Sequence, residues 1–586
     1  MNTTNAVSGG AFLSSYPDLS NIFTPEEFSP ESRFMGATAD NFVKKEVLPH
    51  TDRIESHDIE FMHELMTKAG ALGLLGADVP EVYGGLGLDI RTCALLAEKL
   101  NWQQSFALTH EAHTVIATLP LMYFGNHAQK IKYLPKLATG EWIGAFALSE
   151  TVSGSDALGA ATRADLTDDG ESYVLNGSKM WITNTAFASL FSVFAKVDGD
   201  KFSCFLVESG TPGLSYGKEE NKLGMRGTST RRVILENVNI PKDHVVGEIG
   251  KGHYAAFCAL NLGRFKLEAG AVGGIKETLA VCAAYANQRI QFGRPISSFG
   301  MVKAKLGEMC ARLFGLESAV YRLAGLLDGV FEGIDPTSDD ASKQYHRAAE
   351  EYAIECGIVK VIGSELYSWA TDEAIQIHGG NGYTEEYPVA RAWRDQRLLR
   401  IGEGANEIVR VNIVSTLLRR VSAGRIELTI LEELVRDPDS ESLNLLAVTD
   451  STPVYWMKRH AQFLLNTAKD TFGDNLLEEQ EVVAAIADII CAAFVLESAW
   501  VRCQKMMEAG APEASVVSAV TAARVLTWDA MGRVSTIAND AVSRLISHGA
   551  DVSTGPSSWG NMMDVDSIGL RRDLADAVLA KEGYLW

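Results

Sequence analysis

The sequence predicts an α+β fold that is mostly α-helical, and three observations predict it. Apolar residues recur every three or four positions before residue 145 and again after residue 255, which is typical of amphipathic helices. Short runs of β-branched and aromatic residues fill the segment between these regions. Beyond residue 255, small and large apolar residues alternate along four long stretches, as in the core of a helix bundle. We therefore expect a helical domain, a β domain, a four-helix bundle and further helices, in that order.

The N-terminal part is predicted to be an extended arm followed by helices. Residues 1–29 contain Gly, Ser and Pro without clear periodicity, whereas the pattern of residues 30–145 is helical. The Gly-rich stretch PEVYGGLGLD separates two helical regions. In FMHELMTKAGALGLLG, spacing by three and four places these apolar side chains on one helical face: Phe61, Leu65, Ala69 and Leu72.

The middle of the chain, residues 146–254, is predicted to form the β domain. Its runs are ESYVLNGSKMWIT, LFSVFAKV, FSCFLVES and RRVILENVNIP. The turn formers DDG at 168–170 and NG at 176–177 separate strands in this prediction.

Two helical regions follow. Residues 255–425 contain AGAVGGIKETLAVCAAYANQRI, KLGEMCARLFGLESAVYRLAGLLDGVF, AAEEYAIECGIVKVIGSELYSWATDEAIQIHGG and ANEIVRVNIVSTLLRRV, which predict four long helices. In residues 426–586, the polar stretch RDPDSESLNLLAVTDSTP predicts a linker. Amphipathic helices beyond this linker indicate a second, smaller bundle.

Composition and charge exclude several classes of protein. The 53 basic and 75 acidic residues give a formal charge of −22, which disfavours nucleic-acid binding because phosphate contacts need clustered Lys and Arg. The eight cysteines include no CxxC pair, as expected of buried thiols in a reducing compartment. No basic residue precedes Arg33, so features of a secretory signal or mitochondrial presequence are missing. The apolar run from Val482 to Leu496 is broken by Asp488 and too short to span a bilayer. We expect a cytoplasmic protein without a metal site.

One candidate for acid–base chemistry is Glu403, which lies between two glycines in IGEGANEIVR. Gly402 and Gly404 let the backbone approach a ligand closely, and a carboxylate held there can act as a general base. A solvated glutamate at a helix start would give the same pattern, and this fragment alone favours that interpretation.

Other fragments can hold a cofactor. The loop IHGGNG, residues 377–382, offers unobstructed backbone amides to a phosphate, although an ordinary turn between helices is the more common explanation. In KMWITN, Trp181 and Thr183 share one face of a strand, which suits a flavin, although a core tryptophan is more common. Arg289 and Arg294 in NQRIQFGRPI can bind phosphates or form salt bridges on a helix surface.

The order of these fragments resembles the acyl-CoA dehydrogenase family over residues 30–420. The matching stretches are YLPKLATGEW, ALSETVSGSD, NGSKMWITN, NIPKDHVVGEIGKG, NQRIQFGRPI, AIQIHGGNGYTEEYPVARAWRD and IGEGANEI. The stretch NLGRFKLEAGAVGG, the N-terminal arm and the C-terminal extension are most similar to the very-long-chain branch, including its bacterial members. The resemblance implies the acyl-CoA dehydrogenase fold, with a central β-barrel or sandwich, and an extra C-terminal helical domain.

This resemblance implies an FAD-dependent oxidoreductase acting on CH–CH bonds. Family members take a proton from Cα of an acyl-CoA thioester and pass the Cβ hydride to flavin N5, which yields a trans-2-enoyl-CoA. Glu403 matches the family's base. The isovaleryl and long-chain branches place their base before a bundle arginine, but here Gly263 precedes Arg264 and cannot act as a base. A glutamate at position 403 also disfavours the nitroalkane oxidase branch, which uses aspartate.

The family's motifs also imply binding residues. The loop from Phe146 to Ser155 and the strand Trp181–Thr183 are expected to flank the isoalloxazine, and the NQRIQFGRPI stretch is expected to meet the FAD of a neighbouring subunit. The segment from Gln376 to Gly380 is expected beside the pyrophosphate and adenosine part. The implied cofactor-binding residues are Phe146, Leu148, Ser149, Ser155, Trp181, Ile182, Thr183, Arg289, Gln291, Phe292, Gln376, Ile377, His378, Gly379, Gly380, Ala405, Asn406 and Glu407. The implied substrate-binding residues are Ser155, Asn261, Arg264 and Gly404.

The chain departs from the family pattern at four positions near these motifs. Gly402 stands where an aromatic residue is usual, and the missing ring can widen or reshape the acyl cavity. Ala405 replaces the usual Thr, Val152 replaces a Pro, and Asn261 stands where Asp is frequent. None of these changes removes the expected base or the expected flavin site.

The implied reaction is dehydrogenation of medium-to-long-chain acyl-CoA in fatty-acid β-oxidation, with electron-transferring flavoprotein as the acceptor. Sharing of FAD between subunits implies at least a homodimer. An acyl-CoA oxidase that uses O₂ is an alternative, because the sequence does not show oxygen access. A flavin-containing DNA-damage-response binding protein is a third hypothesis, which acidic residues in the C-terminal extension disfavour. For that extension, we favour a helical pack that closes the dimer or shields the substrate channel over a peripheral membrane contact.

Overall fold

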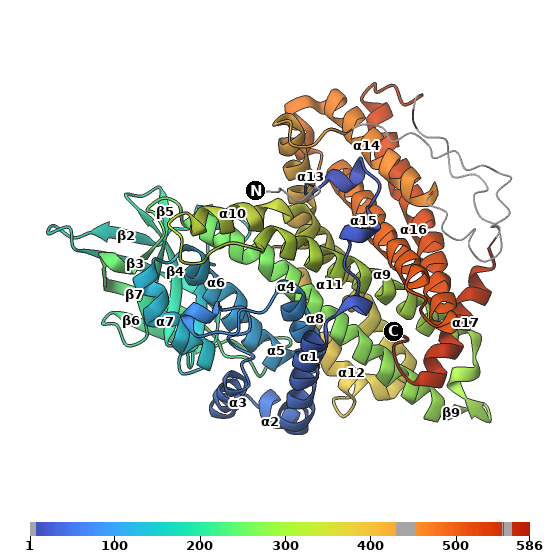
Figure 1. Ribbon diagram of the computed structural model, residues 1–586, viewed down its shortest axis with the longest axis horizontal. Helices are drawn as coiled ribbons and strands as arrows, with labels where there is room; N and C mark the ends of the chain where they lie inside the picture. Colours follow the sequence, from blue (N-terminus) through green and yellow to red (C-terminus); the bar gives the residue numbers. More distant parts are fainter. Residues whose placement is uncertain (1–7, 429–451, 554, 556–564) are drawn as a thin grey trace.

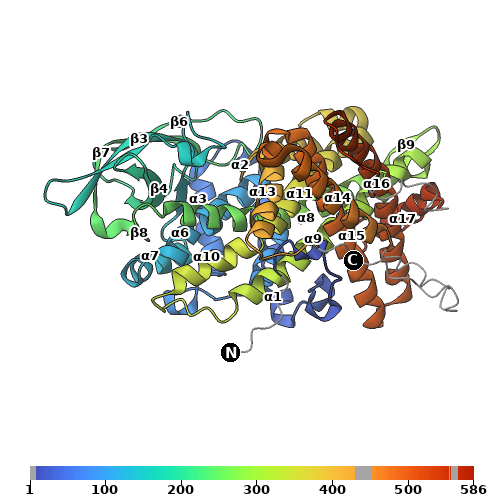
Figure 2. The same ribbon diagram turned by 90° about the horizontal axis from the view of Figure 1, so that it is seen from above.

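The computed structural model describes residues 8–428, 452–553, 555 and 565–586. The β domain lies at one end of the molecule and the C-terminal helices lie at the other, with the long bundle helices between them (Figures 1 and 2). The predicted linker, residues 436–453, falls outside the described residues as far as residue 451. The predicted order of helical domain, β domain, bundle and further helices is therefore correct.

Residues 8–139 form the N-terminal helical part, in which several helices begin at polar caps. The side chains of Ser29, Asp58 and Asp89 each accept a hydrogen bond from a backbone N–H in the first turn that follows. Leu72 does not extend the buried face of the third helix, because that helix ends at Ala71. Three 3₁₀ turns, η1 to η3, occupy the predicted arm at Ala11–Leu13, Leu19–Asn21 and Pro25–Glu27. The helices are α1 (Pro30–Phe42), α2 (Thr51–Glu55), α3 (Ile59–Ala71), α4 (Ile90–Leu100), α5 (Gln104–Glu111), α6 (Thr118–Phe124) and α7 (His127–Thr139), and the turns between them include the π-helical η4 (Val43–Val47) and η7 (Ala112–Ala117).

The β domain is one mixed sheet with the order β6-β7-β3-β2-β4-β5-β8, and β1 pairs in parallel with β4. The prediction that NG at 176–177 forms a turn is wrong. These residues lie inside β3 at a β-bulge opposite β7, where a Cβ on Gly177 would meet Thr162. The strands are β1 (Gly144–Ala147), β2 (Arg163–Leu166), β3 (Ser172–Thr183), β4 (Leu190–Val197), β5 (Lys201–Glu208), β6 (Leu214–Glu219), β7 (Thr230–Pro241) and β8 (Val245–Val246).

The bundle contains the four long helices that the sequence predicts, together with two short helices and a small hairpin. Gly307 and Gly315 let the second long helix approach its neighbours closely, because a Cβ on Gly315 would lie 2.8 Å from Leu526. The elements are α8 (Gly252–Gln288), the hairpin β9 (Ile290–Gln291) and β10 (Arg294–Pro295), α9 (Gly300–Phe331), α10 (Ala341–Glu351), α11 (Ala353–His378), η11 (Gly379–Tyr383), α12 (Pro388–Asp395), η12 (Gln396–Arg400) and α13 (Asn406–Ser422).

The C-terminal extension forms helices that share one continuous hydrophobic core with the bundle. Leu313 of α9, Phe494 and Val525 are members of this core, so the extension is not a separate bundle. Contrary to prediction, the apolar segment around Val482 lies in a helix long and apolar enough to cross a membrane, but 89% of the most apolar 18-residue stretch of that helix is buried inside the protein. The helices are α14 (Thr452–Phe472), α15 (Gln480–Glu508), α16 (Glu513–Ser547) and α17 (Ser567–Lys581).

Both chain ends tie the extension to the bundle. In the arm, the ring of Phe12 packs edge-on against Phe494 of α15 with the ring centres 5.0 Å apart. The guanidinium of Arg502 pairs with Glu26 at 2.7 Å and with Glu317 of α9 at 2.6 Å. Near the C-terminus, the hydroxyl of Tyr584 donates to the same Glu317 carboxylate at 2.5 Å. Glu26, Glu317, Arg502 and Tyr584 belong to a seam of charged groups between α8, α9 and α15.

Candidate functional site

The loop between η12 and α13 holds Glu403 in an uncommon backbone conformation. Glu403 has φ 56°, in the left-handed region where a side chain is strained, and Gly404 has φ 100°. The turn directs the carboxylate toward α8, where a Cβ on Gly263 would lie 3.2 Å from Oε2 of Glu403. Gly263 thus provides the space into which the Glu403 carboxylate extends.

The Oε2 atom of the Glu403 carboxylate is buried, while the residue as a whole is half-buried. Its Oε2 atom has no hydrogen-bond partner among the described residues. Burial raises the pKa of Glu403 to about 7, while the charges of Arg264 and Lys360 act in the opposite direction. A carboxylate with a pKa near neutrality is ionised in a useful fraction of molecules and is basic enough to accept a proton.

Two of the predicted substrate-binding residues support this loop directly. Nε of Arg264 donates to the backbone carbonyl of Glu403 at 2.8 Å. Asn261, one helical turn earlier on α8, accepts a hydrogen bond from Nη1 of Arg264 at 3.1 Å. The pair therefore orients the turn that carries the Glu403 carboxylate.

The three residues after Gly404 have different surroundings. Ala405 is the N-cap residue of α13, and Glu407 is exposed in its first turn. Asn406 is buried, and its amide group contacts Lys360, Ser364 and Glu365 of α11. The Asn406 side chain thus holds the loop onto α11 and faces away from the surface.

Two more carboxylates, one facing α8 and one on α8 itself, have no charged partner in contact among the described residues. A Cβ on Gly270 would lie 3.0 Å from Oε1 of Glu111, seven residues and therefore about 10.5 Å along the helix from Gly263. Burial raises the pKa of Glu111 to about 8 and raises that of Glu268 well above its usual value. Both carboxylate oxygens of Glu268 lack a hydrogen-bond partner among the described residues.

The predicted flavin loop is anchored to strand β3 by a buried ion pair. Nζ of Lys179 lies 2.6 Å from the Glu150 carboxylate and donates to the carbonyl of Leu148 at 3.1 Å. The carbonyl of Ser149 accepts from the amide of Met180 at 2.8 Å. These bonds fix residues 148–150 against β3, while Ser155 beyond them is exposed.

Next to this loop, Trp181 presents its indole to the surface. Trp181 has φ 57° at a register shift between β3 and β7, and 58% of the residue is exposed. Its neighbours Ile182 and Thr183 are buried and half-buried, and Phe146 of β1 packs on Phe194. An exposed indole on a rigid strand fits a flat aromatic cofactor.

The predicted cofactor residues of the β9–β10 hairpin and of the end of α11 lie at a different end of the molecule. The β9–β10 hairpin is remote from the β domain in both views (Figures 1 and 2). Arg289 and Gln291 are exposed there, and Phe292 at the hairpin turn is 94% exposed. One chain therefore does not bring the hairpin and Trp181 to the same place.

The end of α11 lies beside this hairpin region, where Tyr285 of α8 donates to the carbonyl of His378. The side chains of Ile377 and His378 face inward, and the His378 ring stacks on that of Tyr285. Gln376 is exposed, and a Cβ on Gly379 or Gly380 would meet nothing within 4 Å. The open backbone of Gly379 and Gly380 can contact phosphates, and the exposed ring of Phe292 can contact a flat ring. This combination fits a dinucleotide such as FAD.

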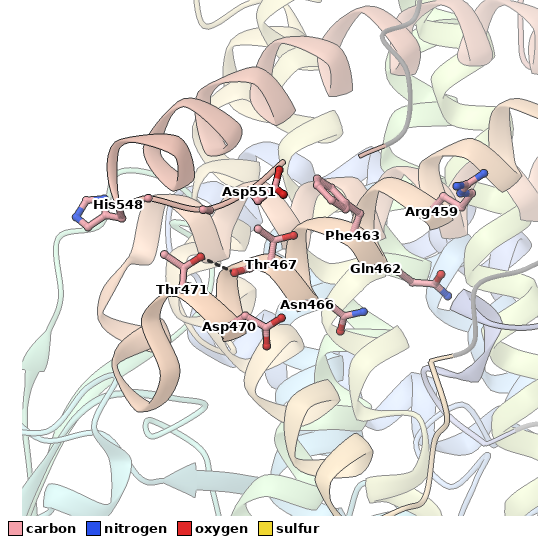
Figure 3. Close-up of a pocket in the computed structure, with 11 residues that line it drawn as sticks. Arg459, Gln462, Phe463, Asn466, Thr467, Asp470, Thr471, His548 and Asp551 are labelled. Carbon is pink, nitrogen blue, oxygen red and sulfur yellow. Dashed lines mark hydrogen bonds between the residues drawn. The ribbon is translucent and has the colours of Figure 1, made fainter. Parts of the chain in front are cut away.

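A cavity away from these residues lies in the C-terminal extension. A cavity of about 660 Å³ lies between α14 and the segment after α16, as Figure 3 shows. None of the residues predicted to bind cofactor or substrate lines it. Its lining residues are Arg459, Gln462, Phe463, Asn466, Thr467, Asp470, Thr471, His548, Gly549, Ala550 and Asp551.

Several residues of the site escaped the sequence analysis. Lys360 lies in the apolar run GIVKVIG, and a single charge in such a run is a signal of a buried functional or structural group. Glu268 precedes the small apolar stretch AGAVGG and gives the same kind of signal. Glu111 has no such signal, because its neighbours are polar and small.

Comparisons with known proteins agree with this geometry. Family models described as the N-terminal, middle and C-terminal domains of acyl-CoA dehydrogenase match residues 29–141, 145–238 and 250–418. A further model, also described as an acyl-CoA dehydrogenase C-terminal domain, matches residues 457–552 in the extension.

Individual relatives support the same family assignment. A protein of Bacillus subtilis (strain 168) named probable acyl-CoA dehydrogenase is 45% identical over 510 residues, which cover 86% of each chain. The very long-chain specific acyl-CoA dehydrogenase of Macaca fascicularis mitochondria is 35% identical over 410 residues, 68% of this chain and 58% of its own length. The crystal structure of an acyl-CoA dehydrogenase complexed with FAD from Bacillus anthracis superposes with a TM-score of 0.92 at 39% identity, covering 99% of this chain and 100% of that one. The chain therefore belongs to the acyl-CoA dehydrogenase family of FAD-dependent oxidoreductases, as the sequence motifs predict.

Proposed function

We propose that the protein dehydrogenates medium-to-long-chain acyl-CoA thioesters to trans-2-enoyl-CoA in cytoplasmic fatty-acid β-oxidation, with Glu403 as the catalytic base. The observation that carries this proposal is the buried Glu403 carboxylate, which has an unpartnered oxygen and lies in the space beside Gly263. No solvated glutamate at a helix start would have these surroundings.

In this reaction Glu403 removes the proton from Cα of the acyl group. An α-proton of a thioester is weakly acidic, so the base must be basic and water must be excluded. Burial meets both needs, because it raises the pKa of Glu403 to about 7. Arg264 holds the Glu403 carbonyl and so fixes the direction of the carboxylate. FAD, when bound, supplies the acceptor for the hydride that leaves Cβ.

We assign FAD to two groups of residues from two copies of the chain. The loop from Phe146 to Ser155 and Trp181 would hold the ring of the cofactor bound to one copy. The β9–β10 hairpin and the end of α11 of a second copy would hold the remainder. The distance between these groups in one chain supports this assignment (Figure 1). With the cofactor shared in this way, the proposal includes at least a homodimer.

The substrate range rests on the relatives and on the residue before Glu403. Curated relatives include very long-chain specific enzymes, but also short-chain and isovaleryl-specific ones. A Cβ on Gly402 would meet no atom closer than 3.6 Å, so the glycine is not required by close packing at this position. We therefore propose medium-to-long acyl chains as substrates and electron-transferring flavoprotein as the electron acceptor.

The test uses the FAD-loaded enzyme and a series of acyl-CoA chain lengths. Anaerobic addition of a good substrate should bleach the flavin absorbance, and Glu403→Gln should slow that bleaching by about 10²- to 10⁴-fold, the usual contribution of a general base. Normal bleaching by the variant would show that Glu403 is not the base.

The acceptor is tested separately with the same enzyme. Turnover should be fast with electron-transferring flavoprotein and should produce little hydrogen peroxide in air. A stoichiometric peroxide yield in air would instead identify an acyl-CoA oxidase.

A gel shift with DNA at physiological salt tests the hypothesis of a DNA-binding protein. It should show no retardation, since the chain carries a charge of −22.

A further inference from the structure

The loop that carries Glu403 is held by two cations, and only one of them was expected from the sequence. Arg264 donates to the carbonyl of Glu403. The second cation is Lys360 of α11, whose Nζ donates to the carbonyl of Gly404 and to Oδ1 of Asn406, both at 2.6 Å. Two successive carbonyls of the left-handed turn are thus each bound by a charged donor.

The position of Lys360 is fixed from several sides. The residue has no exposed surface, and its backbone carbonyl accepts from the hydroxyl of Ser364. The amide of Asn406 cannot turn freely, because its Nδ2 atom donates to Ser364 at 3.1 Å and to Glu365 at 3.0 Å. This arrangement leaves Oδ1 of Asn406 as the acceptor for Lys360.

The backbone needs such support. A non-glycine residue in the left-handed region costs roughly 1 kcal/mol or more, so the turn at Glu403 would relax without fixed partners. A hydrogen bond from a charged donor is about twice as strong as one between neutral groups. Lys360 is well placed to keep Gly404, and with it the Glu403 carboxylate, in one orientation.

We propose that Lys360 is a positioning residue for the dehydrogenation, which holds the Glu403–Gly404 turn through the Gly404 carbonyl and Asn406. This inference rests on the proposed function of Glu403 as the base. Lys360 does not reach the reacting atoms in this role, because its amino group is occupied by the carbonyl and the amide oxygen.

The charge of Lys360 adds a second, measurable effect. The ionisable groups that face Lys360 are Glu268 and Arg264 of α8, Glu403 of the loop and Glu365 of α11. Burial lowers the pKa of Lys360 to about 8, so the side chain is still charged at neutral pH. That charge lowers the pKa of Glu403. Removal of the charge should therefore raise the pKa of Glu403 and shift the acid limb of the kcat profile to higher pH.

The main variant is Lys360→Met in the FAD-loaded enzyme. We expect kcat to fall by about 10- to 100-fold, because a displacement of the base of about 1 Å can cost this much. KM should change little, since the lysine does not contact the substrate. The acid limb of the kcat profile should move to higher pH in Lys360→Met. Lys360→Arg, which keeps the charge, should leave that limb near the wild-type pH.

The matched control is Lys458→Met. Lys458 is also a buried lysine that donates to a backbone carbonyl, that of Ser15, and to a carboxylate, that of Glu497, but it lies in the C-terminal extension. Its loss should lower the denaturation midpoint without a shift in the kcat profile. If both methionine variants shift the profile alike, the effect belongs to any lost buried lysine and the positioning role is refuted.

The remaining outcomes separate the two proposals. An inactive Glu403→Gln variant beside a Lys360→Met variant with wild-type kcat and pH profile would refute the role of Lys360 alone. An active Glu403→Gln variant would refute the base itself. If Lys360→Met does not fold, the same measurements on Lys360→Gln decide the question, since glutamine is neutral and can still donate one hydrogen bond.

Discussion

Two regions around α8 contain buried glutamates, and the two sets behave in opposite ways. Around the loop that carries Glu403, burial raises the pKa of Glu111 to about 8 and that of Glu403 to about 7. Glu98 of α4 extends the seam between α8, α9 and α15 through its contact with Lys276 of α8. Burial also disfavours ionisation of Glu98, but Lys276 and Lys99 outweigh it and the pKa falls to about 2. The pKa of Glu317 is lowered in the same way.

The pKa shifts of the two sets have opposite directions because the carboxylates differ in their charged partners, and not because they differ in depth of burial. Lys276 contacts both seam carboxylates, Glu98 at 2.9 Å and Glu317 at 2.5 Å. Tyrosine hydroxyls donate to the same two groups. In the part of the chain that the structure describes, no cation directly contacts the carboxylates of Glu403 and Glu111. A buried carboxylate with charged partners stabilises a junction, whereas one without them is available for proton transfer.

Loss of the shared cation should have the largest effect on this contrast. Lys276→Met leaves both seam carboxylates short of a partner, and removal of one member of a buried ion pair costs about 3–5 kcal/mol. We expect a large drop in the denaturation midpoint with kcat of the folded enzyme unchanged. The double variant Lys276→Met, Glu317→Gln should recover part of the loss. Wild-type stability of the single variant would contradict the importance of the seam.

The next effect concerns the pH dependence of stability. The folded pKa of Glu111 is above its unfolded value, so its contribution to stability is complete below about pH 4.5 and is lost as the pH rises to about 8. Glu111→Gln should flatten the fall in stability over this range, by at most about 1.4 kcal/mol per pH unit. Denaturation midpoints measured from pH 5 to pH 8 test this, and parallel curves for both proteins would contradict it.

The smallest effect should come from an exposed ion pair. Arg544 of α16 contacts Glu479 at 2.9 Å, and about half of the arginine side chain is exposed. Solvent and salt screen such a pair, so Arg544→Met should leave both the denaturation midpoint and kcat almost unchanged. A drop in the denaturation midpoint comparable to that of Lys276→Met would mean that the contribution of an ion pair to the stability of this protein does not depend on its burial.

Much of the fold could be predicted from local patterns. Stretches in which apolar residues recur with a period of 3.6 predicted the long helices, and runs of β-branched residues predicted the strands of the middle domain. The misassigned details were positions where a distant contact overrides local preference. The NG pair lies in a bulge of β3 because Asn176 accepts from the amide of Asn237 on β7. The extension joined the core of the bundle because α15 and α16 pack on α9, which no local pattern reveals.

By itself, the sequence determined the family, the candidate base Glu403 and the motifs of the cofactor site, because these features are runs of neighbouring residues. Only the tertiary structure decided which charges surround each buried group. Lys360 meets Gly404 across 44 positions of sequence, and Arg264 meets Glu403 across 139. Protonation depends on such contacts, since the free energy of a buried charge is set by the groups that fold against it.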